Sequence, residues 1–455
     1  MRSELARDLG ASQATAVVVG TIIGSGIFLV PAEMTRDVGS ARLVFLAWIV
    51  GGLLSLFGAL TYAELGAMRP AAGGEYVYVR DAYGPLPAFL YAWTWFVIAK
   101  PASVASVAVG LVRILGTFPA LSFLSDPLIS FPVPVTYGQL VAISAALLIS
   151  LLNYLGIRKA GEFQLVFTLL KIAMVLAIVV IGFGWAGGSW THFIGNFSGA
   201  IGGTRGFMAA LVAALWAYDG WNDLNMVAGE VRHPERNIPM ALIGGVATVG
   251  LLYMLVNAAL QYVLPATAIA NSERPASLAM QLALGPAGAS LVSGGIALSM
   301  LVTLNGTIMS GARVPFAVAR DGYFFRQLAE VHPRFRTPSN AIIVQAVLSV
   351  VLLLLASSFE RLFSLAIFAE WLFYMIAGST IFVFRRREPS ASRPYKVWGY
   401  PLVPILFVLA SARLLYSVFT YHLLDSAIGL VIILAGVPLF YVFAGRRPAA
   451  SQLGP

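Results

Sequence analysis

The chain has 455 residues, of which 59% are hydrophobic and 11% are charged. A soluble domain carries about 25% charged residues, so the composition excludes a string of soluble domains and a disordered chain. The sequence contains no cysteine, which excludes disulfide bonds, thiolate metal sites and a cysteine nucleophile. The net charge is +9, but the basic residues are spread over many short loops, which favours a membrane protein over one that binds nucleic acid.

Twelve apolar stretches are long enough to cross a bilayer, which takes about 20 residues per helix. They occupy Ser12–Met34, Leu43–Leu65, Pro85–Gly116, Tyr137–Gly156, Gln164–Gly187, Gly206–Gly229, Met240–Val263, Ala287–Gly311, Asn340–Ser357, Leu362–Phe384, Pro401–Tyr421 and Ser426–Phe443. The first stretch lacks the cleavage site of a signal peptide, and the sequence lacks the alternation of a membrane β-barrel. We therefore expect an all-α integral membrane protein in which residues 1–455 form one transmembrane domain with 12 spanning helices.

Arginine and lysine are distributed unevenly between the two sides of these stretches. Twenty lie in loops on the side of the N-terminus, five lie on the other side, and four lie inside spans. Because basic loops stay in the cytoplasm, we expect a multi-pass protein of the inner (cytoplasmic) membrane, surrounded by lipid, with both termini cytoplasmic. The run Arg385–Arg387 is interpreted as a topology anchor, and lipid headgroup binding is the alternative.

The first span contains three glycines, Gly20, Gly24 and Gly26, within seven residues. Each glycine weakens a helix by about 1 kcal/mol relative to alanine, and backbone groups freed in lipid must find partners. A break here would direct the amide groups of Ser25, Gly26 and Ile27 at an anion, assisted by the positive end of the following half-helix. Close helix packing through small residues is the alternative.

The sixth span contains unusually polar residues at Trp216, Asp219, Trp221, Asn222 and Asp223. A charge at the centre of a spanning helix costs about 2.5–3.5 kcal/mol even on insertion scales, so a cavity or an unwound segment is expected here. Carbonyls exposed by unwinding would accept hydrogen bonds from an ammonium group. A polar contact between helices is the alternative.

The breaks in spans 1 and 6 occupy corresponding positions if spans 1–5 and 6–10 are two repeats. These repeats would cover about 12–187 and 206–384, and two further helices would cover about 401–443. Paired interrupted spans indicate an inverted-repeat transporter with a substrate site near the middle of the bilayer.

Lys171 is seven residues into span 5, about 10 Å deep at 1.5 Å per residue. A buried ammonium needs acceptors, and carbonyls of an unwound span 1 are candidates. Ser299 and Thr303 share one face of span 8 and could contribute their hydroxyls to the same place. A structural pin without a role in transport is the alternative.

Other polar groups in the spans are weaker candidates. A structural use is favoured for Lys100, before Pro101, but the roles of Lys100, Asp223 and Glu370 are all left open. Glu64 and Glu230 are expected to pair with nearby arginines. The four histidines are His192, His233, His332 and His422, and their spacing is not that of metal ligands. We therefore expect no metal and no cofactor. Nucleotide-binding and catalytic motifs are also absent from the sequence, so an enzyme is not expected.

Several motifs follow one another along almost the whole chain. They are GTIIGSGIF, FGALTYAELG, GGEYVYVRDAYG, WAYDGWN, GEVRHPERNIPMAL, NGTIMSGARVPFAVARDG and WLFY. In these motifs the sequence resembles the amino acid–polyamine–organocation superfamily, and more narrowly the L-type amino acid transporter family and its bacterial members. The resemblance implies the LeuT-type fold, with five plus five helices in inverted repeats, broken helices 1 and 6, and two additional helices.

The resemblance also implies where the backbone of an amino acid would lie. The substrate carboxylate would face the amides of Ser25 and Gly26, and its amine would face carbonyls near Ile22, Trp216 and Asp219. Glycine stands at the position of Asp219 in the mammalian carriers of large neutral amino acids, so side-chain specificity does not carry over.

Further roles follow from the same resemblance. Trp216 matches the aromatic gate of the family, and Asn222 and Trp371 lie near its side-chain pocket. Lys171 matches a lysine that replaces a sodium ion. The mammalian members use an external cysteine to join a glycoprotein, and without a cysteine this chain has no disulfide-linked partner subunit.

The sequence therefore favours a secondary transporter that is sodium-independent and exchanges neutral L-amino acids by alternating access. Proton-coupled uptake, with Lys171 or an interior carboxylate titrating, is the alternative. A transporter-like receptor would bind the same molecules without flux.

Overall fold

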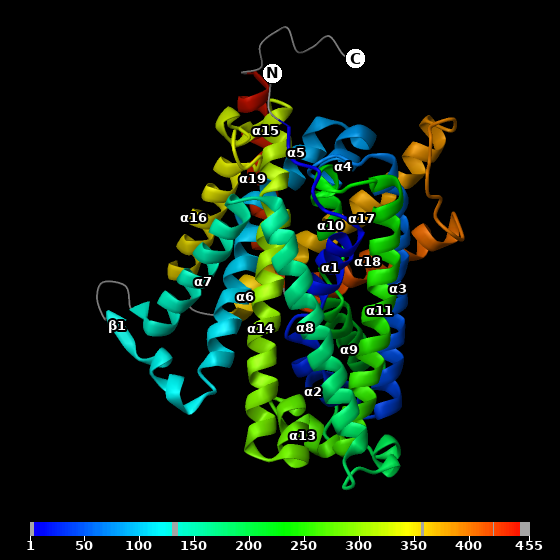
Figure 1. Ribbon diagram of the computed structural model, residues 1–455. Coiled ribbons are helices and arrows are strands. Elements are labelled where there is room, and N and C mark those ends of the chain that lie inside the picture. Colours follow the sequence, from blue (N-terminus) through cyan, green and yellow to red (C-terminus); the bar gives the residue numbers. More distant parts are fainter. Residues whose placement is uncertain (1–3, 130–134, 356–358, 422, 446–455) are drawn as a thin grey trace.

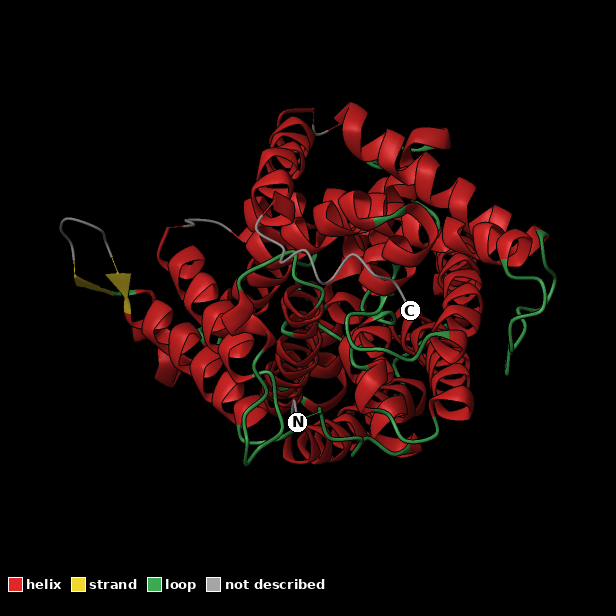
Figure 2. Ribbon diagram, turned by 90° about the horizontal axis from the view of Figure 1, so that it is seen from above, coloured by secondary structure: helices red, strands yellow, loops and turns green. Residues whose placement is uncertain are grey.

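The structure, a computed structural model, describes residues 4–129, 135–355, 359–421 and 423–445. Of the residues used above, His422 and the end of the predicted span at Ser357 lie outside these ranges, as do three of the counted arginines, Arg2, Arg446 and Arg447. Most helices run along the axis of one bundle, and a short two-stranded hairpin projects from its flank (Figures 1 and 2). The all-α class predicted from the sequence is confirmed.

The helices and strands follow the predicted spans closely. The α-helices are α1 (Ala11–Ile22), α2 (Gly26–Val38), α3 (Ala41–Met68), α4 (Glu75–Tyr83), α5 (Pro85–Thr94), α6 (Lys100–Leu115), α7 (Tyr137–Tyr154), α8 (Ile157–Gly184), α9 (Gly203–Ala217), α10 (Asp223–Met226), α11 (Pro234–Val263), α12 (Ala266–Asn271), α13 (Pro275–Leu284), α14 (Pro286–Gly311), α15 (Arg313–Arg320), α16 (Ser339–Leu355), α17 (Phe359–Arg387), α18 (Leu402–Tyr421) and α19 (Leu423–Gly445). The remaining elements are the π-helical turn η1 (Trp95–Ala99), the 3-10 turns η2 (Pro119–Ser125), η3 (Trp190–Ile194), η4 (Ala228–Glu230) and η5 (Arg326–Ala329), and the strands β1 (Pro127–Ile129) and β2 (Val135–Thr136).

Within the described ranges, nine helical segments are long and apolar enough to cross a membrane. The other predicted spans correspond to α9 with 15 residues, α16 with 17 and α17 with 29. Large apolar side chains face outward on the long helices, among them Leu148 on α7, Val180 on α8 and Leu251 on α11, which are 65%, 70% and 62% exposed. An outer surface of this composition is suited to lipid.

Both predicted helix breaks are present. The first span is divided into α1 and α2 by Ile23–Ser25, and the sixth ends as a long helix at Ala217, before the short α10. Gly220 lies in the second break with φ +101°, a left-handed conformation that favours glycine. A Cβ atom there would lie 2.8 Å from Cγ2 of Thr21, so glycine also allows this segment to approach α1.

The four half-helices are packed in two pairs. The helices before the first break and after the second, α1 and α10, contact each other, and so do α2 and α9. Helices α8, α11 and α14 pack around α1, and α3 packs against α9. This arrangement brings the two breaks to the same level inside the bundle.

A third irregularity is η1, the π-helical turn that precedes α6. Pro101 lacks an amide hydrogen, and its ring interferes with the carbonyl four residues earlier, at Val97. The helix therefore widens by one residue over Trp95–Ala99. The wider turn sets the position of Lys100, the first residue of α6.

The start of the described chain and the end of α19 lie at the same end of the bundle (Figure 1). Buried ion pairs close this end. Arg313 pairs with Glu230, and Arg385 pairs with Glu64, which also accepts a hydrogen bond from the amide of Val397 at 2.8 Å. The predicted pairing of both glutamates with arginines is confirmed.

Candidate functional site: a charged cavity between two helix breaks

A cavity of about 120 Å³ lies where the two breaks meet. One buried water needs roughly 10–15 Å³ by the same measure, so the cavity has room for a solute of about ten non-hydrogen atoms. Its wall is formed by the ends of the broken helices together with α6, α14 and α17. Of the residues predicted for the site, those in the wall are Ile22, Ser25, Gly26, Trp216, Asp219 and Thr303.

The start of α2 presents backbone amides to this cavity. The first amides of a helix, here those of Gly26 and Ile27, have no carbonyl in their own helix to bond to. Ser25 is the N-cap residue, and its side chain makes no capping bond. The side chain of Ile27 is fully buried and lies outside the wall, so only its amide bears on the anion site.

Gly26 has a packing role as well. A Cβ atom on this residue would lie 3.0 Å from Cβ of Ala217 and 3.6 Å from Cζ3 of Trp216. Glycine therefore lets the start of α2 approach the end of α9, and a larger residue would collide with the protein itself.

Tyr253 of α11 links the two breaks. Its hydroxyl lies 3.1 Å from the carbonyl oxygen of Ile22, at the end of α1, and 2.9 Å from that of Ala217, at the end of α9. The sequence analysis missed this residue, because a lone tyrosine in an apolar span carries no distinguishing pattern. The Ile22 carbonyl also accepts a hydrogen bond from the amide of Gly24 at 2.8 Å, so both of its lone pairs are engaged within the protein.

Lys171 of α8 is fully buried against the end of α1. Its ammonium donates to the carbonyl of Gly20 at 2.7 Å and to that of Ile23. The hydroxyl of Ser299 donates to the Ile23 carbonyl at 2.7 Å, and that of Thr303 donates to the Gly20 carbonyl at 3.4 Å. Three side chains from two helices thus satisfy the carbonyls that the break frees.

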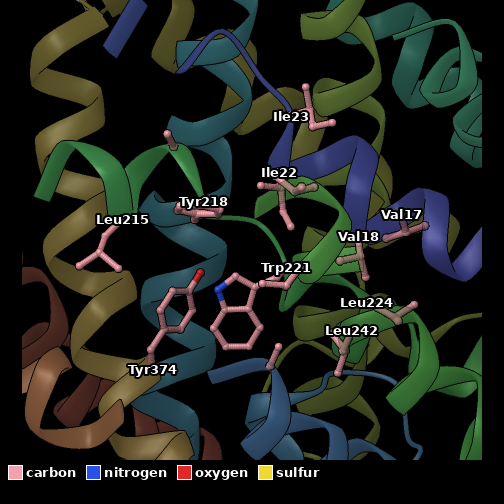
Figure 3. Close-up of a cluster of buried hydrophobic side chains, with 14 of the residues drawn as sticks. Val17, Val18, Ile22, Ile23, Leu215, Tyr218, Trp221, Leu224, Leu242 and Tyr374 are labelled. Atoms are coloured by element: carbon pink, nitrogen blue, oxygen red, sulfur yellow. The ribbon is translucent and has the colours of Figure 1, made fainter. Parts of the chain in front are cut away.

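Two predicted pocket residues lie behind the wall. Asn222 is fully buried, donates to Glu75 at 2.6 Å and accepts from the hydroxyl of Tyr374 at 3.0 Å. Trp371 packs edge-on against Tyr374, with ring centroids 5.6 Å apart. Figure 3 shows Tyr374 beside Trp221, close to Ile22 at the end of α1. Asn222 and Trp371 therefore lie outside the wall of the cavity and pack against residues around it.

The cavity wall also contains charged residues that the sequence analysis did not assign to the site. Lys100 of α6 and Asp223 of α10 form a buried ion pair, and Glu370 of α17 lies in the same wall. Lys100, whose role the sequence leaves open, both pairs with Asp223 and lines the cavity. The signal in the sequence was the charge itself, which is costly at this depth.

A multi-pass helical bundle with two broken helices around a charged internal cavity has the construction of a secondary transporter. The comparisons with known proteins agree. A family model described as amino acid permease matches residues 9–443.

Three relatives illustrate the range of similar proteins. The chain is 33% identical to the serine/threonine exchanger SteT of Bacillus subtilis (strain 168), over 97% of this chain and 98% of the relative. It is 32% identical to the human b(0,+)-type amino acid transporter 1, over 99% and 90% of the two chains. It is 30% identical to the human cystine/glutamate transporter, over 97% and 86%.

The chain therefore belongs to the amino acid permease family, within the amino acid–polyamine–organocation superfamily, as its motifs predicted. It is an integral multi-pass membrane protein and a transporter, not an enzyme. Its 455 residues include no cysteine with which to join a partner subunit by a disulfide.

Proposed function

We propose that this protein exchanges L-amino acids across the inner membrane by alternating access, without sodium, and with both termini in the cytoplasm. In this proposal the 12 spans form a LeuT-type bundle, with inverted repeats at about 12–187 and 206–384 and two additional helices. The observation that carries the proposal is the cavity between two helix breaks, in a chain of the amino acid permease family.

The ends of the broken helices offer complementary partners to the backbone of an amino acid. The amides of Ser25, Gly26 and Ile27 lie at the positive end of α2, which favours a carboxylate. The carboxylate of Asp219, in the same wall, would accept hydrogen bonds from the α-ammonium group. Trp216, at the end of α9, would cover the bound molecule and exclude water from these charges.

The position of Lys171 supports sodium independence. Its ammonium occupies the carbonyls at the end of α1, which a sodium ion would otherwise use. Two unit charges about 4 Å apart repel by roughly 4 kcal/mol at an effective dielectric near 20. Since 1.4 kcal/mol is a tenfold change in affinity, sodium would bind about a thousandfold more weakly.

The test is amino acid counterflow into liposomes that contain the purified protein, with sodium replaced by choline. We expect uptake that depends on amino acid inside the liposomes and is unaffected by choline. Lys171→Ala should reduce this flux strongly, because the carbonyls of Gly20 and Ile23 lose their main donor. Lys159→Ala is a matched control, since it removes the same side chain from an exposed position near the start of α8. A strong sodium requirement in the parent, or equal flux in Lys171→Ala, would contradict the assignment.

Proton-coupled uptake is the alternative, because the cavity contains carboxylates that could carry a proton. It predicts net uptake that follows a pH gradient into liposomes containing no amino acid.

The backbone contacts do not determine the side chain of the substrate. The neutral side chain predicted from the sequence stays a prediction, and it has to be weighed against the charges in the cavity wall.

A further inference from the structure

The wall of the cavity carries one cationic and three anionic side chains. Lys100 is the cation, and Asp219, Asp223 and Glu370 are the carboxylates. With all four ionised, the empty cavity has a net charge of −2. A zwitterionic amino acid adds no net charge, so it leaves this excess unchanged.

The single cation is already engaged. The ammonium of Lys100 contacts Oδ1 of Asp223, and the two side chains are 6% and 1% exposed. The same ammonium lies 5.4 Å from the ring centroid of Trp95. Oδ2 of Asp223 is buried and has no hydrogen-bond partner in the described chain. A buried carboxylate oxygen without a donor is an exception in folded proteins, and this one is free to accept a hydrogen bond from a molecule in the cavity.

Asp219 has a different environment. It lies in the second break, and its Oδ1 accepts a hydrogen bond from the hydroxyl of Tyr374 at 3.0 Å. This places its carboxylate beside the carbonyls at the ends of α1 and α9, where the α-ammonium group of a substrate would lie. Asp219 would therefore have the α-ammonium group of the substrate as its partner, while the substrate carboxylate faces the amides at the start of α2.

Glu370 is the carboxylate that stays unmatched. Glu370 is 6% exposed, and its Oε1 accepts one long hydrogen bond, from the hydroxyl of Ser103 at 3.4 Å. It takes part in none of the salt bridges found in the described ranges. An unpaired buried charge is strongly unfavourable, so the ionised form of this group needs a cation from outside the protein.

We propose that the substrate is an L-amino acid with a cationic side chain, about the size of ornithine or lysine, and that Glu370 determines this preference by accepting the side-chain charge. The inference rests on the proposed transport of amino acids and specifies its substrate class. The volume agrees, because ornithine and lysine have about ten non-hydrogen atoms and the cavity holds roughly ten waters. The side-chain ammonium also provides a donor within the same wall as the unpartnered oxygen of Asp223.

The experiment compares lysine with norleucine, which has the same carbon chain without the terminal ammonium group. Counterflow is measured in liposomes with the parent, with Glu370→Gln and with Glu162→Gln. Glu162→Gln is the control, because it makes the same chemical change at the surface. There Glu162 pairs with Arg158, away from the cavity. We expect the parent to prefer lysine, and we expect Glu370→Gln to reduce that preference about tenfold or more while norleucine transport persists. Glu162→Gln should behave like the parent.

The other outcomes separate this inference from the proposed function. If the parent carries norleucine or serine as well as it carries lysine, the side-chain assignment is wrong and amino acid transport stands. If Glu370→Gln keeps the full preference for lysine, Glu370 is not the determinant. If uptake of a neutral amino acid follows a pH gradient in the parent and loses that dependence in Glu370→Gln, the carboxylate carries a proton and the inference is overturned. If the folded protein catalyses no amino acid counterflow at all, the proposed function itself fails.

Discussion

Glu75 illustrates how a single buried residue can make the stability of this protein depend on pH. It begins α4, outside the spanning helices, and Asn222 donates to its Oε1 while the hydroxyl of Tyr91 donates to its Oε2 at 3.3 Å. Burial raises the pKa of this carboxyl to about 7, although the hydrogen bond from Asn222 lowers it. Lys100 and Asp223 also act on it, in opposite directions.

The raised pKa gives a prediction with a definite sign. A carboxyl with a raised pKa stabilises the fold below its unfolded value of 4.5, and this contribution is lost as the pH rises through 7. Glu75→Gln keeps an acceptor for Asn222 and cannot ionise. We expect the thermal midpoint of the parent in detergent to fall relative to that of Glu75→Gln between pH 6 and pH 8.5. Parallel pH profiles for the two proteins would show that Glu75 does not titrate in this range.

At this scale, the residues that contribute backbone groups to the candidate site are easier to predict from the sequence than those that contribute side chains. Ser25 and Gly26 stand out because glycine inside an apolar span has a recognisable cost. Tyr253 does not stand out, and Glu370 stands out only by its charge, because the roles of both depend on which helices pack together. Lys100 was noticed for its charge, but its partner Asp223 is 123 residues away, and no local pattern joins them.

At the scale of elements, both helix breaks were predictable and the π-helical turn was not. A run of glycines or of polar residues in a span departs from the expected composition, and it marks a break directly. The turn at Trp95–Ala99 arises because Pro101 follows several residues later within an otherwise regular helix. The hairpin of β1 and β2 was also not predicted, since its strands have three and two residues and follow no visible alternation.

The second break gives a prediction about backbone strain. Gly220→Ala should destabilise the protein by about 1–3 kcal/mol, because φ +101° is strained for alanine and its Cβ would collide with Thr21. Gly244→Ala is the matched control, since Gly244 lies inside α11 and its Cβ would meet no atom within 4 Å. We expect the control to be neutral or stabilising. The measurement is the thermal midpoint in detergent, and equal midpoints for the two variants would contradict the strain argument.

At the scale of the whole molecule, ion pairs join helices that are far apart in the sequence at one end of the bundle. Arg313 of α15 donates through Nε and Nη2 to the carboxylate of Glu230 at 2.8 and 3.0 Å, and through Nη1 to the carbonyl of Met309 at 2.7 Å. Neither side chain of the pair is exposed. Near them, the amide of Leu9 donates to the carbonyl of Glu230 at 3.0 Å, so the segment before α1 is joined to the same cluster.

This cluster predicts a non-additive response to mutation. Arg313→Met leaves Glu230 buried without a partner and should cost about 3–5 kcal/mol of stability. The double variant Arg313→Met, Glu230→Gln removes both charges, and we expect it to recover much of that loss. Stability is measured as the thermal midpoint in one detergent at one pH. A double variant no more stable than Arg313→Met alone would show that the unpaired charge is not the cause.

The full burial of Lys171 has a practical consequence, because the chain contains only four lysines. Lys159 and Lys396 are exposed, Lys100 is held by Asp223, and Lys171 is covered by the end of α1. An amine-reactive reagent can therefore modify Lys171 only while that helix end has moved aside. Peptide mass spectrometry of the labelled protein would then report how often the end of α1 moves away from Lys171. The two exposed lysines provide an internal standard, and no cysteine has to be introduced.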